Sequence, residues 1–227
     1  MTSERLEILD LARQVRNYLD YMASLGVTHL PRTAAVDLPA AEPPKAETLE
    51  DIRQDLGECT RCPLCQNRTN IVFGEGAAKA EVVFVGEGPG REEDLQGRPF
   101  VGAAGRLLTD IIVKGMKMRR EDVYIANVVK CRPPENREPQ PLEAKTCLPF
   151  LQRQIASIRP RIIIALGRVA AHYLLDTSES LHEIRNRLHD YQGIPLVPTY
   201  HPAAILYDAR VKRPVWEDIK KVLALLT

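Results

Sequence analysis

From residue 81 onward, short continuous apolar runs alternate with stretches in which apolar residues recur at helical spacing. The apolar runs are 81–86, 123–130, 161–167 and 194–200. Helical spacing follows them near 103–116 and at 141–157, 168–175 and 214–226. Runs that are apolar throughout are typical of parallel strands covered by helices on both faces. We therefore expect a three-layer α/β/α domain around a central four-stranded, mainly parallel sheet.

The first 46 residues follow a different pattern. Residues 3–25 place apolar side chains at helical spacing with charges between them, which predicts one amphipathic helix. Residues 31–46 are rich in Pro and Ala and read as a linker. Thr48 then resembles a helix N-cap, with Asp51 three residues later. We expect a helix and linker over 1–46 and the main domain over 47–227.

Composition narrows the class of protein without deciding its function. The 227 residues are 44% hydrophobic and 27% charged, as in an ordinary globular protein. Residues 1–58 hold 6 basic and 11 acidic side chains, whereas 59–227 hold 25 basic and 19 acidic. The larger part could face a polyanion, although a solvated surface of mixed charge would look the same. With neither a membrane-spanning run nor a secretory leader in the sequence, we expect a cytoplasmic protein.

The five cysteines are clustered in a way that suggests a metal centre. Cys59, Cys62 and Cys65 form C-x2-C-x2-C, and Cys131 and Cys147 lie far downstream. An odd count in a chain of this length argues against a disulfide framework, and thiolates two residues apart can bind one metal centre. The alternative is a set of small buried side chains, which fits poorly among Arg, Pro and Asn. Spacing alone favours Cys65 as a ligand and does not distinguish zinc from an iron–sulfur cluster.

The loop after the first apolar run carries three glycines. Gly86, Gly88 and Gly90 are spaced G-x-G-x-G with Pro89 between them, which departs from the dinucleotide fingerprint G-x-G-x-x-G. The acidic residues at 92–94 would repel phosphates. This leaves two interpretations: a tight turn with a charged, solvated tail, or a catalytic loop whose carboxylates position water.

Three further residues are candidates for a site, and two of them, Asn127 and His201, stand at or just beyond a strand end, where ligands bind in α/β sheets. Phe100, in a glycine-flanked segment, either stacks on a planar base or anchors its loop. Asn127 interrupts an apolar run, so its amide either caps a local turn or binds a ligand. His201 follows the fourth run and is either a structural or a catalytic imidazole.

Together these segments resemble the family 4 uracil-DNA glycosylases, the iron–sulfur branch of the uracil-DNA glycosylase superfamily. The resemblance covers roughly residues 50–227. It rests on Cys59, Cys62 and Cys147, on GEGPGREEDLQGRPFVGAAGRLL (86–108), on NVVKCRPPENREP (127–139), on LGRVAA (166–171) and on HPAAIL (201–206). The helix and linker over 1–46 lie outside it.

The resemblance implies a 4Fe–4S cluster, DNA containing uracil as the partner, and a monomeric enzyme that hydrolyses the N-glycosidic bond of uracil. The implied cluster ligands are Cys59, Cys62, Cys131 and Cys147, which leaves Cys65 free. A DNA-binding member of the superfamily with little or no glycosylase activity is the alternative. An electron-transfer or nucleotide-cofactor protein is a more distant one.

The resemblance also implies a role for each matching residue in the base pocket. Phe100 would stack on the flipped uracil, and Asn127 would hydrogen-bond its O4 and N3–H. Glu87 and Gly88 would line the pocket, and His201 would donate to O2 of the departing base.

Other implied roles concern the DNA and the attacking water. Ile205 and Leu206 would wedge into the duplex, and Gly90 would contact a phosphate. Several branches of the superfamily carry Asp or Asn where Gly88 stands, to position the water. Here Glu87 or Glu93 would do so, and we favour Glu87.

Overall fold

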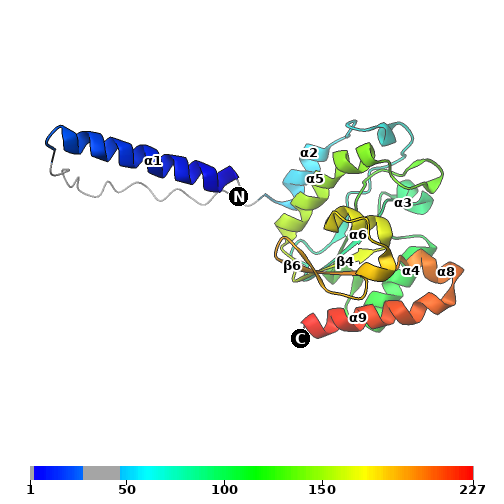
Figure 1. Ribbon diagram of the computed structural model, residues 1–227. Coiled ribbons are helices and arrows are strands. Elements are labelled where there is room, and N and C mark those ends of the chain that lie inside the picture. Colours follow the sequence, from blue (N-terminus) through cyan, green and yellow to red (C-terminus); the bar gives the residue numbers. More distant parts are fainter. Residues whose placement is uncertain (1–2, 28–46, 227) are drawn as a thin grey trace. The chain divides into compact units, whose positions relative to one another are not determined.

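The computed structural model describes residues 3–27 and 47–226. The chain divides into two compact units, Met1–Lys45 and Ala46–Thr227. In the first unit α1 (Ser3–Ser24) confirms the predicted N-terminal helix, drawn in blue in Figure 1. The predicted linker lies outside the described residues. No described helix combines the length and the apolar character that crossing a bilayer requires.

The second unit is built on a mixed sheet in the order β1-β3-β2-β4-β6-β5. The strands are β1 (Glu75–Gly76), β2 (Val82–Gly86), β3 (Tyr124–Asn127), β4 (Ile162–Leu166), β5 (His189–Tyr191) and β6 (Ile194–Thr199). The four predicted strands are the four central ones, and all of their mutual pairings are parallel. Two short antiparallel edge strands, β1 and β5, extend the expected four-stranded sheet to six.

Helices cover both faces of the sheet, as Figure 1 shows for α5 and α6 and for α4 and α9. The helices of this unit are α2 (Leu49–Leu56), α3 (Arg91–Gln96), α4 (Ala103–Asp110), α5 (Pro141–Ile158), α6 (Arg168–Leu175), α7 (Leu181–Ile184), α8 (Pro202–Tyr207) and α9 (Lys212–Leu226). One core layer joins α5 and α6 to the sheet face of Val83 and Ile163. The other joins α4 and α9 to the face of Phe84 and Ile164. Alternate residues of the same strands thus face opposite layers, which confirms the three-layer prediction.

Two local predictions can be compared with the structure directly. The Thr48 hydroxyl accepts the Asp51 N–H at 3.2 Å, and the Asp51 carboxylate accepts the Thr48 N–H at 2.9 Å, so the predicted capping box is present. The helix expected near 103–116 ends as an α-helix at Asp110 and continues as a π-helical turn over Ile111–Gly115.

The parallel arrangement brings the strand ends that carry the candidate residues to one edge of the sheet. Gly86 at the end of β2 is paired in register with Asn127 at the end of β3. On the other side Leu166 of β4 is paired with Thr199 of β6, two residues before His201. Ligands of open α/β sheets bind at this carboxyl edge.

Candidate functional site

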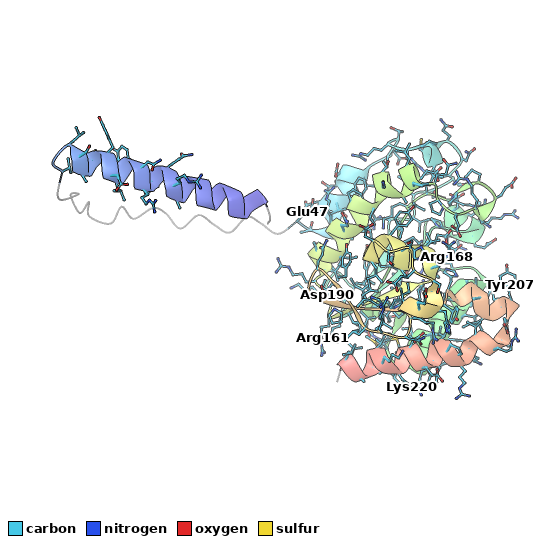
Figure 2. All side chains as sticks on the ribbon, viewed as in Figure 1. Glu47, Arg161, Arg168, Asp190, Tyr207 and Lys220 are labelled. Carbon is cyan, nitrogen blue, oxygen red and sulfur yellow. The ribbon has the colours of Figure 1, made fainter. Side chains whose placement is uncertain are left out.

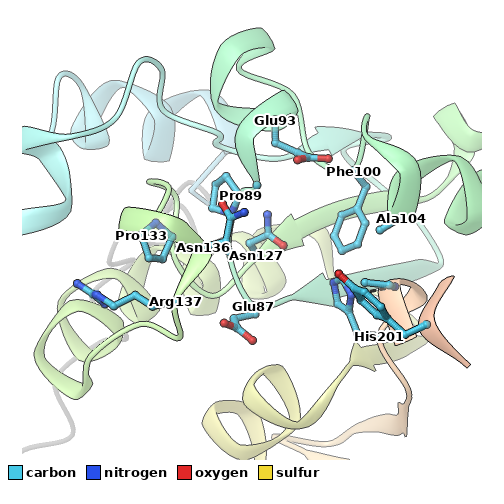
Figure 3. Close-up of a pocket in the computed structure, with 14 residues that line it drawn as sticks. Glu87, Pro89, Glu93, Phe100, Ala104, Asn127, Pro133, Asn136, Arg137 and His201 are labelled. Atoms are coloured by element: carbon cyan, nitrogen blue, oxygen red, sulfur yellow. Dashed lines mark hydrogen bonds between the residues drawn. The ribbon is translucent and has the colours of Figure 1, made fainter. Parts of the chain in front are cut away.

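A cavity of about 400 Å³ opens at the carboxyl edge of the sheet (Figure 3). All seven residues that the sequence nominated for catalysis or substrate binding line it: Glu87, Gly88, Gly90, Glu93, Phe100, Asn127 and His201. The sequence did not nominate its other lining residues, Pro89, Ala104, Pro133, Asn136, Arg137, Ala203 and Tyr207. The nominated residues come from the segment 87–100 after β2, from the last residue of β3 and from the residue before α8, so the fold assembles them.

Asn127 is the last residue of β3, lines the cavity and carries an unsatisfied polar atom. Its side chain is almost fully buried, and its Oδ1 has no hydrogen-bond partner among the described residues. The neighbouring Gly86 gives the amide its space, because a Cβ there would lie 2.4 Å from Oδ1. Buried polar atoms without partners are rare and costly. This oxygen is therefore suited to a ligand that brings an N–H donor.

Phe100 forms an aromatic wall of the same cavity. Its ring centroid lies 5.5 Å from that of His201, with 33° between the ring planes. The backbone of Phe100 is left-handed, with φ of 53°, a conformation that costs free energy in a residue other than glycine. Close packing holds it there, because a Cβ at Gly105 would lie only 2.0 Å from the Phe100 carbonyl oxygen. The loop thus fixes the ring as a rigid surface.

The His201 imidazole is neutral and carries its proton on Nε2. Its Nδ1 accepts the backbone N–H of Ala203 at 3.2 Å, where His201 caps the start of α8. Burial lowers the pKa of His201 to about 4, against the opposing effect of Glu93. With Nδ1 used as an acceptor, a neutral ring must hold its proton on the other nitrogen. His201 can therefore donate a hydrogen bond without being charged.

The two acidic candidates differ in what their carboxylates contact. Glu93 Oε1 accepts the N–H groups of Val101 at 2.8 Å and Gly102 at 2.9 Å, so it fastens the Phe100 loop. Burial and nearby Glu138 raise the pKa of Glu87 to about 7, with Arg168 opposing. A carboxyl group with a pKa near 7 can exchange protons under ordinary conditions. Glu87 is thus the better placed of the two to act on water.

Gly88 and Gly90 are glycines for a steric reason. A Cβ at Gly88 would lie 2.7 Å from Val129 Cγ2, on the segment that leads to Cys131. A Cβ at Gly90 would lie 2.8 Å from Glu93 Oε2. The lack of a side chain at 88 therefore follows from close packing against the loop after β3.

The two predicted wedge residues lie in different surroundings. Leu206 is half exposed, whereas Ile205 packs against the core layer of α4 and α9. The next residue, Tyr207, is 91% exposed and also lines the base cavity; Figure 2 shows it at the molecular surface. Leu206 and Tyr207 are thus the two residues of this segment whose side chains are exposed. Nothing in the sequence indicated that Tyr207 belongs to the site, apart from its position next to HPAAIL.

Four of the five cysteines line a second, small cavity. They are Cys59, Cys62, Cys131 and Cys147, and Cys65 does not line it. Arg68 Nη1 donates to Cys131 Sγ and the Lys130 backbone N–H to Cys147 Sγ, both at 3.3 Å. Such donors stabilise thiolate sulfur and tune cluster ligands.

Burial raises the pKa of the Cys62, Cys131 and Cys147 thiols, for Cys131 to about 11, so a bound cation is needed to deprotonate them. In the described ranges no three His, Cys, Asp or Glu side chains are arranged to hold a single metal ion. The donor set, four thiols on one cavity with N–H donors on two sulfurs, nevertheless fits a group ligated by cysteine.

Comparison with known proteins identifies the family. A model of the uracil-DNA glycosylase superfamily matches residues 73–220. The chain belongs to this superfamily, in its type-4 branch. It is 46% identical over 186 residues to a type-4 uracil-DNA glycosylase of Thermotoga maritima, covering 80% of this chain and 96% of the relative. It is 45% identical over 187 residues to that of Sulfurisphaera tokodaii (79% and 85%) and 43% over 184 residues to that of Archaeoglobus fulgidus (78% and 92%).

The superfamily match covers the base cavity more completely than the cysteine cavity. The matched span includes Glu87, Phe100, Asn127 and His201, and it includes Cys131 and Cys147. Cys59 and Cys62 precede it. The matched span therefore contains the nominated residues of the base cavity and two of the four cysteines of the second cavity.

Proposed function

We propose that this protein removes uracil from DNA by hydrolysing the N-glycosidic bond of a flipped-out nucleotide. The observation that carries the proposal is Asn127 Oδ1, which lacks a partner among the described residues and belongs to a side chain that lines the same cavity as Phe100 and the neutral His201. An enzyme that acts on a base must take it out of the stack into such a pocket. The type-4 relatives are named for this activity, and they cover most of the chain.

The Asn127 amide supplies the choice of base. Uracil presents an N3–H donor and an O4 acceptor, which match the acceptor Oδ1 and the donor Nδ2 of one amide. Cytosine presents the reverse order, an unprotonated N3 and an amino group. Since no described protein group satisfies Oδ1, the uracil N3–H supplies the missing bond, whereas cytosine leaves two acceptors facing each other. Phe100 stacks on the face of the selected base.

His201 stabilises the leaving group. As the glycosidic bond breaks, negative charge builds on uracil O2, and the Nε2–H of the neutral imidazole donates to it. The backbone bond from Ala203 fixes the ring in advance. Donors that are oriented before the reaction stabilise a developing anion best in a buried site.

Glu87 orients the attacking water. Its carboxylate lines the cavity, whereas that of Glu93 is already occupied by two backbone N–H donors of the Phe100 loop. An oxocarbenium-like transition state needs only a weak nucleophile, so orientation and partial proton removal are sufficient. A pKa of about 7 leaves Glu87 ionised above neutrality.

Leu206 is the residue that enters the gap left by the flipped base, since it is half exposed beside the pocket. Apolar side chains inserted between base steps unstack DNA in this way. We propose that the enzyme acts as a monomer. Its unpaired cysteines are consistent with action in the cytoplasm.

Cys59, Cys62, Cys131 and Cys147 would hold a 4Fe–4S cluster. Bound there, the cluster would supply a structural crosslink rather than a chemical step. The cysteines belong to three separate parts of the chain: the segment after α2, the loop after β3, and α5. Crosslinking them fixes the loop 131–137, which forms one wall of the base pocket through Pro133, Asn136 and Arg137.

The test is excision from a labelled duplex with one uracil opposite guanine, followed by alkali to cut the abasic product. We expect strand scission with uracil and none when thymine or cytosine replaces it. The Asn127→Ala variant is the matched control for a contaminating glycosylase, because it should be inactive when purified in the same way. Absence of scission by the brown, folded wild type would favour the DNA-binding alternative.

A further inference from the structure

Lys130 is a buried lysine that the proposed mechanism does not use. Its side chain is fully buried, and within residues 47–226 no carboxylate forms an ion pair with it. The ammonium instead donates to the Asn127 carbonyl oxygen at 2.9 Å and to Gln154 Oε1 at 2.6 Å. Burying an ammonium is costly, and these two hydrogen bonds offset part of that cost.

The partner of Lys130 is itself anchored on two sides. Gln154, on α5, is fully buried and donates through Nε2 to the Phe73 carbonyl at 2.9 Å and to the Tyr124 hydroxyl at 3.2 Å. Tyr124 is the first residue of β3, and Asn127 is the last. The Lys130–Gln154 pair therefore connects the end of β3 to its beginning through α5.

Lys130 also touches the cysteine cavity. Its backbone N–H donates to Cys147 Sγ at 3.3 Å, and the next residue is Cys131. A single residue thus contacts the Asn127 backbone through its side chain and the cysteine set through its main chain. Within the described part of the chain the Asn127 side chain has no bond at Oδ1, so its direction depends on how the backbone at 127 is held.

We propose that Lys130 is a positioning residue for base recognition: by holding the Asn127 carbonyl, it aims the Asn127 amide at the uracil. This inference rests on the proposed function of the pocket. It assigns to Lys130 no contact with the base or with the reacting atoms. It predicts that removing the ammonium changes uracil binding more than it changes DNA binding.

The test compares full-length Lys130→Met, Asn127→Ala, the double variant and Leu151→Ala with the wild type. Leu151→Ala is the control for lost stability, because Leu151 is a buried core residue on the same helix as Gln154. Two probes are titrated: free uracil by calorimetry, and a duplex with a tetrahydrofuran abasic site, which presents no base. Visible absorbance is recorded as well, and Lys130→Met should keep it because the main-chain N–H to Cys147 remains.

For Lys130→Met we expect uracil affinity to fall by about tenfold, the cost of losing a hydrogen bond from a charged group. Affinity for the abasic duplex should stay within about twofold, and the double variant should bind uracil no more weakly than Asn127→Ala. Leu151→Ala should bind uracil as the wild type does. Unchanged uracil affinity in Lys130→Met, or an equal loss for both probes, would overturn the proposal.

A second variant covers the case in which Lys130→Met does not fold. Gln154→Met removes one partner of the ammonium and leaves Lys130 in place, and we expect it to weaken uracil binding by about threefold. A folded Gln154→Met variant with wild-type uracil affinity would contradict the proposal. If the wild type itself binds no uracil and cuts no uracil-containing duplex, the proposed function fails, which is a different result from normal binding by the variants.

Discussion

The base pocket and the cysteine cavity border the two ends of one five-residue segment, 127–131, yet they satisfy their polar atoms in opposite ways. The base pocket leaves Asn127 Oδ1 without a partner among the described residues and keeps His201 neutral. The cysteine cavity instead directs N–H donors at the sulfurs of Cys131 and Cys147. The first arrangement suits a neutral ligand that enters and leaves, and the second suits a negatively charged group that stays. An unsatisfied hydrogen-bond acceptor is thus typical of the substrate pocket, whereas sulfurs that already accept hydrogen bonds are typical of the structural centre.

The largest effect should come from breaking the structural centre. Cys131→Ala should lose the brown absorbance and destabilise the fold by about 3 kcal/mol or more, because binding energy at a structural metal site is folding energy. Cys65→Ala is the matched control, since Cys65 is outside the cavity, and it should keep both colour and stability. Iron analysis and thermal melts measure the two. Loss of colour in Cys65→Ala with retention in Cys131→Ala would reverse the ligand assignment.

Replacing His201, the neutral hydrogen-bond donor, should impair excision in the base pocket and leave the cysteine cavity unaffected. We expect His201→Gln to lower the single-turnover excision rate by about 10²- to 10³-fold, the usual cost of removing one preorganised donor. Its iron content should equal that of the wild type. A rate within about threefold of the wild type would remove His201 from the mechanism.

Glu87 allows the pocket to be probed by pH. Because its pKa is raised to about 7, the excision rate should rise as pH increases through 7 and then level off. Glu87→Gln should flatten this profile and lower the rate at pH 8 by about 10- to 100-fold. If Glu87→Gln keeps the inflection near pH 7, the inflection reflects the titration of another group.

The same pKa shift has a consequence for stability. A carboxyl whose pKa is higher in the folded state contributes stability below its unfolded value of 4.5, and loses it as pH rises through about 7. The stability of Glu87→Gln relative to the wild type should therefore increase between pH 5 and pH 8. Urea unfolding at the two pH values measures this, and a relative stability that falls with pH would contradict the shift.

The smallest effect should separate the two residues of the predicted wedge. Leu206→Ala should lower excision from duplex DNA by about three- to tenfold and leave single-stranded DNA unaffected, because only the duplex has a gap to fill. Ile205→Ala should instead cost about 1–3 kcal/mol of stability, since its side chain packs against the core. If Ile205→Ala alone loses activity on duplex DNA, Ile205 rather than Leu206 is the wedge.

The central fold could be predicted because its strands are buried on both faces. The run 162–166 is apolar throughout, and short runs of this kind between helical stretches are typical of strands covered by helices on both sides. The edge strands could not be predicted in this way. β1 is two residues long and β5 is His-Asp-Tyr, so neither shows a hydrophobic period. Their pairing is a consequence of the tertiary structure.

The candidate site could be predicted where a residue departs from its surroundings. Asn127 in an apolar run and His201 before a proline are visible in the sequence. Tyr207 and Arg137 have no such contrast with their neighbours, and they reach the cavity only through the placement of α8 and of the loop after β3. Lys130 was also hidden, because lysine side chains are seldom fully buried, whereas this one is buried and donates to Gln154 of α5.

The central claim is that Asn127 Oδ1, which has no hydrogen-bond partner among the described residues, accepts the N3–H of uracil. The most direct measurement is a crystal structure of the full chain with uracil bound. We predict the base on the ring of Phe100, its N3–H within hydrogen-bond distance of Asn127 Oδ1, and its O2 at His201 Nε2. A structure with uracil outside this cavity, or with Oδ1 bonded only to protein atoms, would contradict the account.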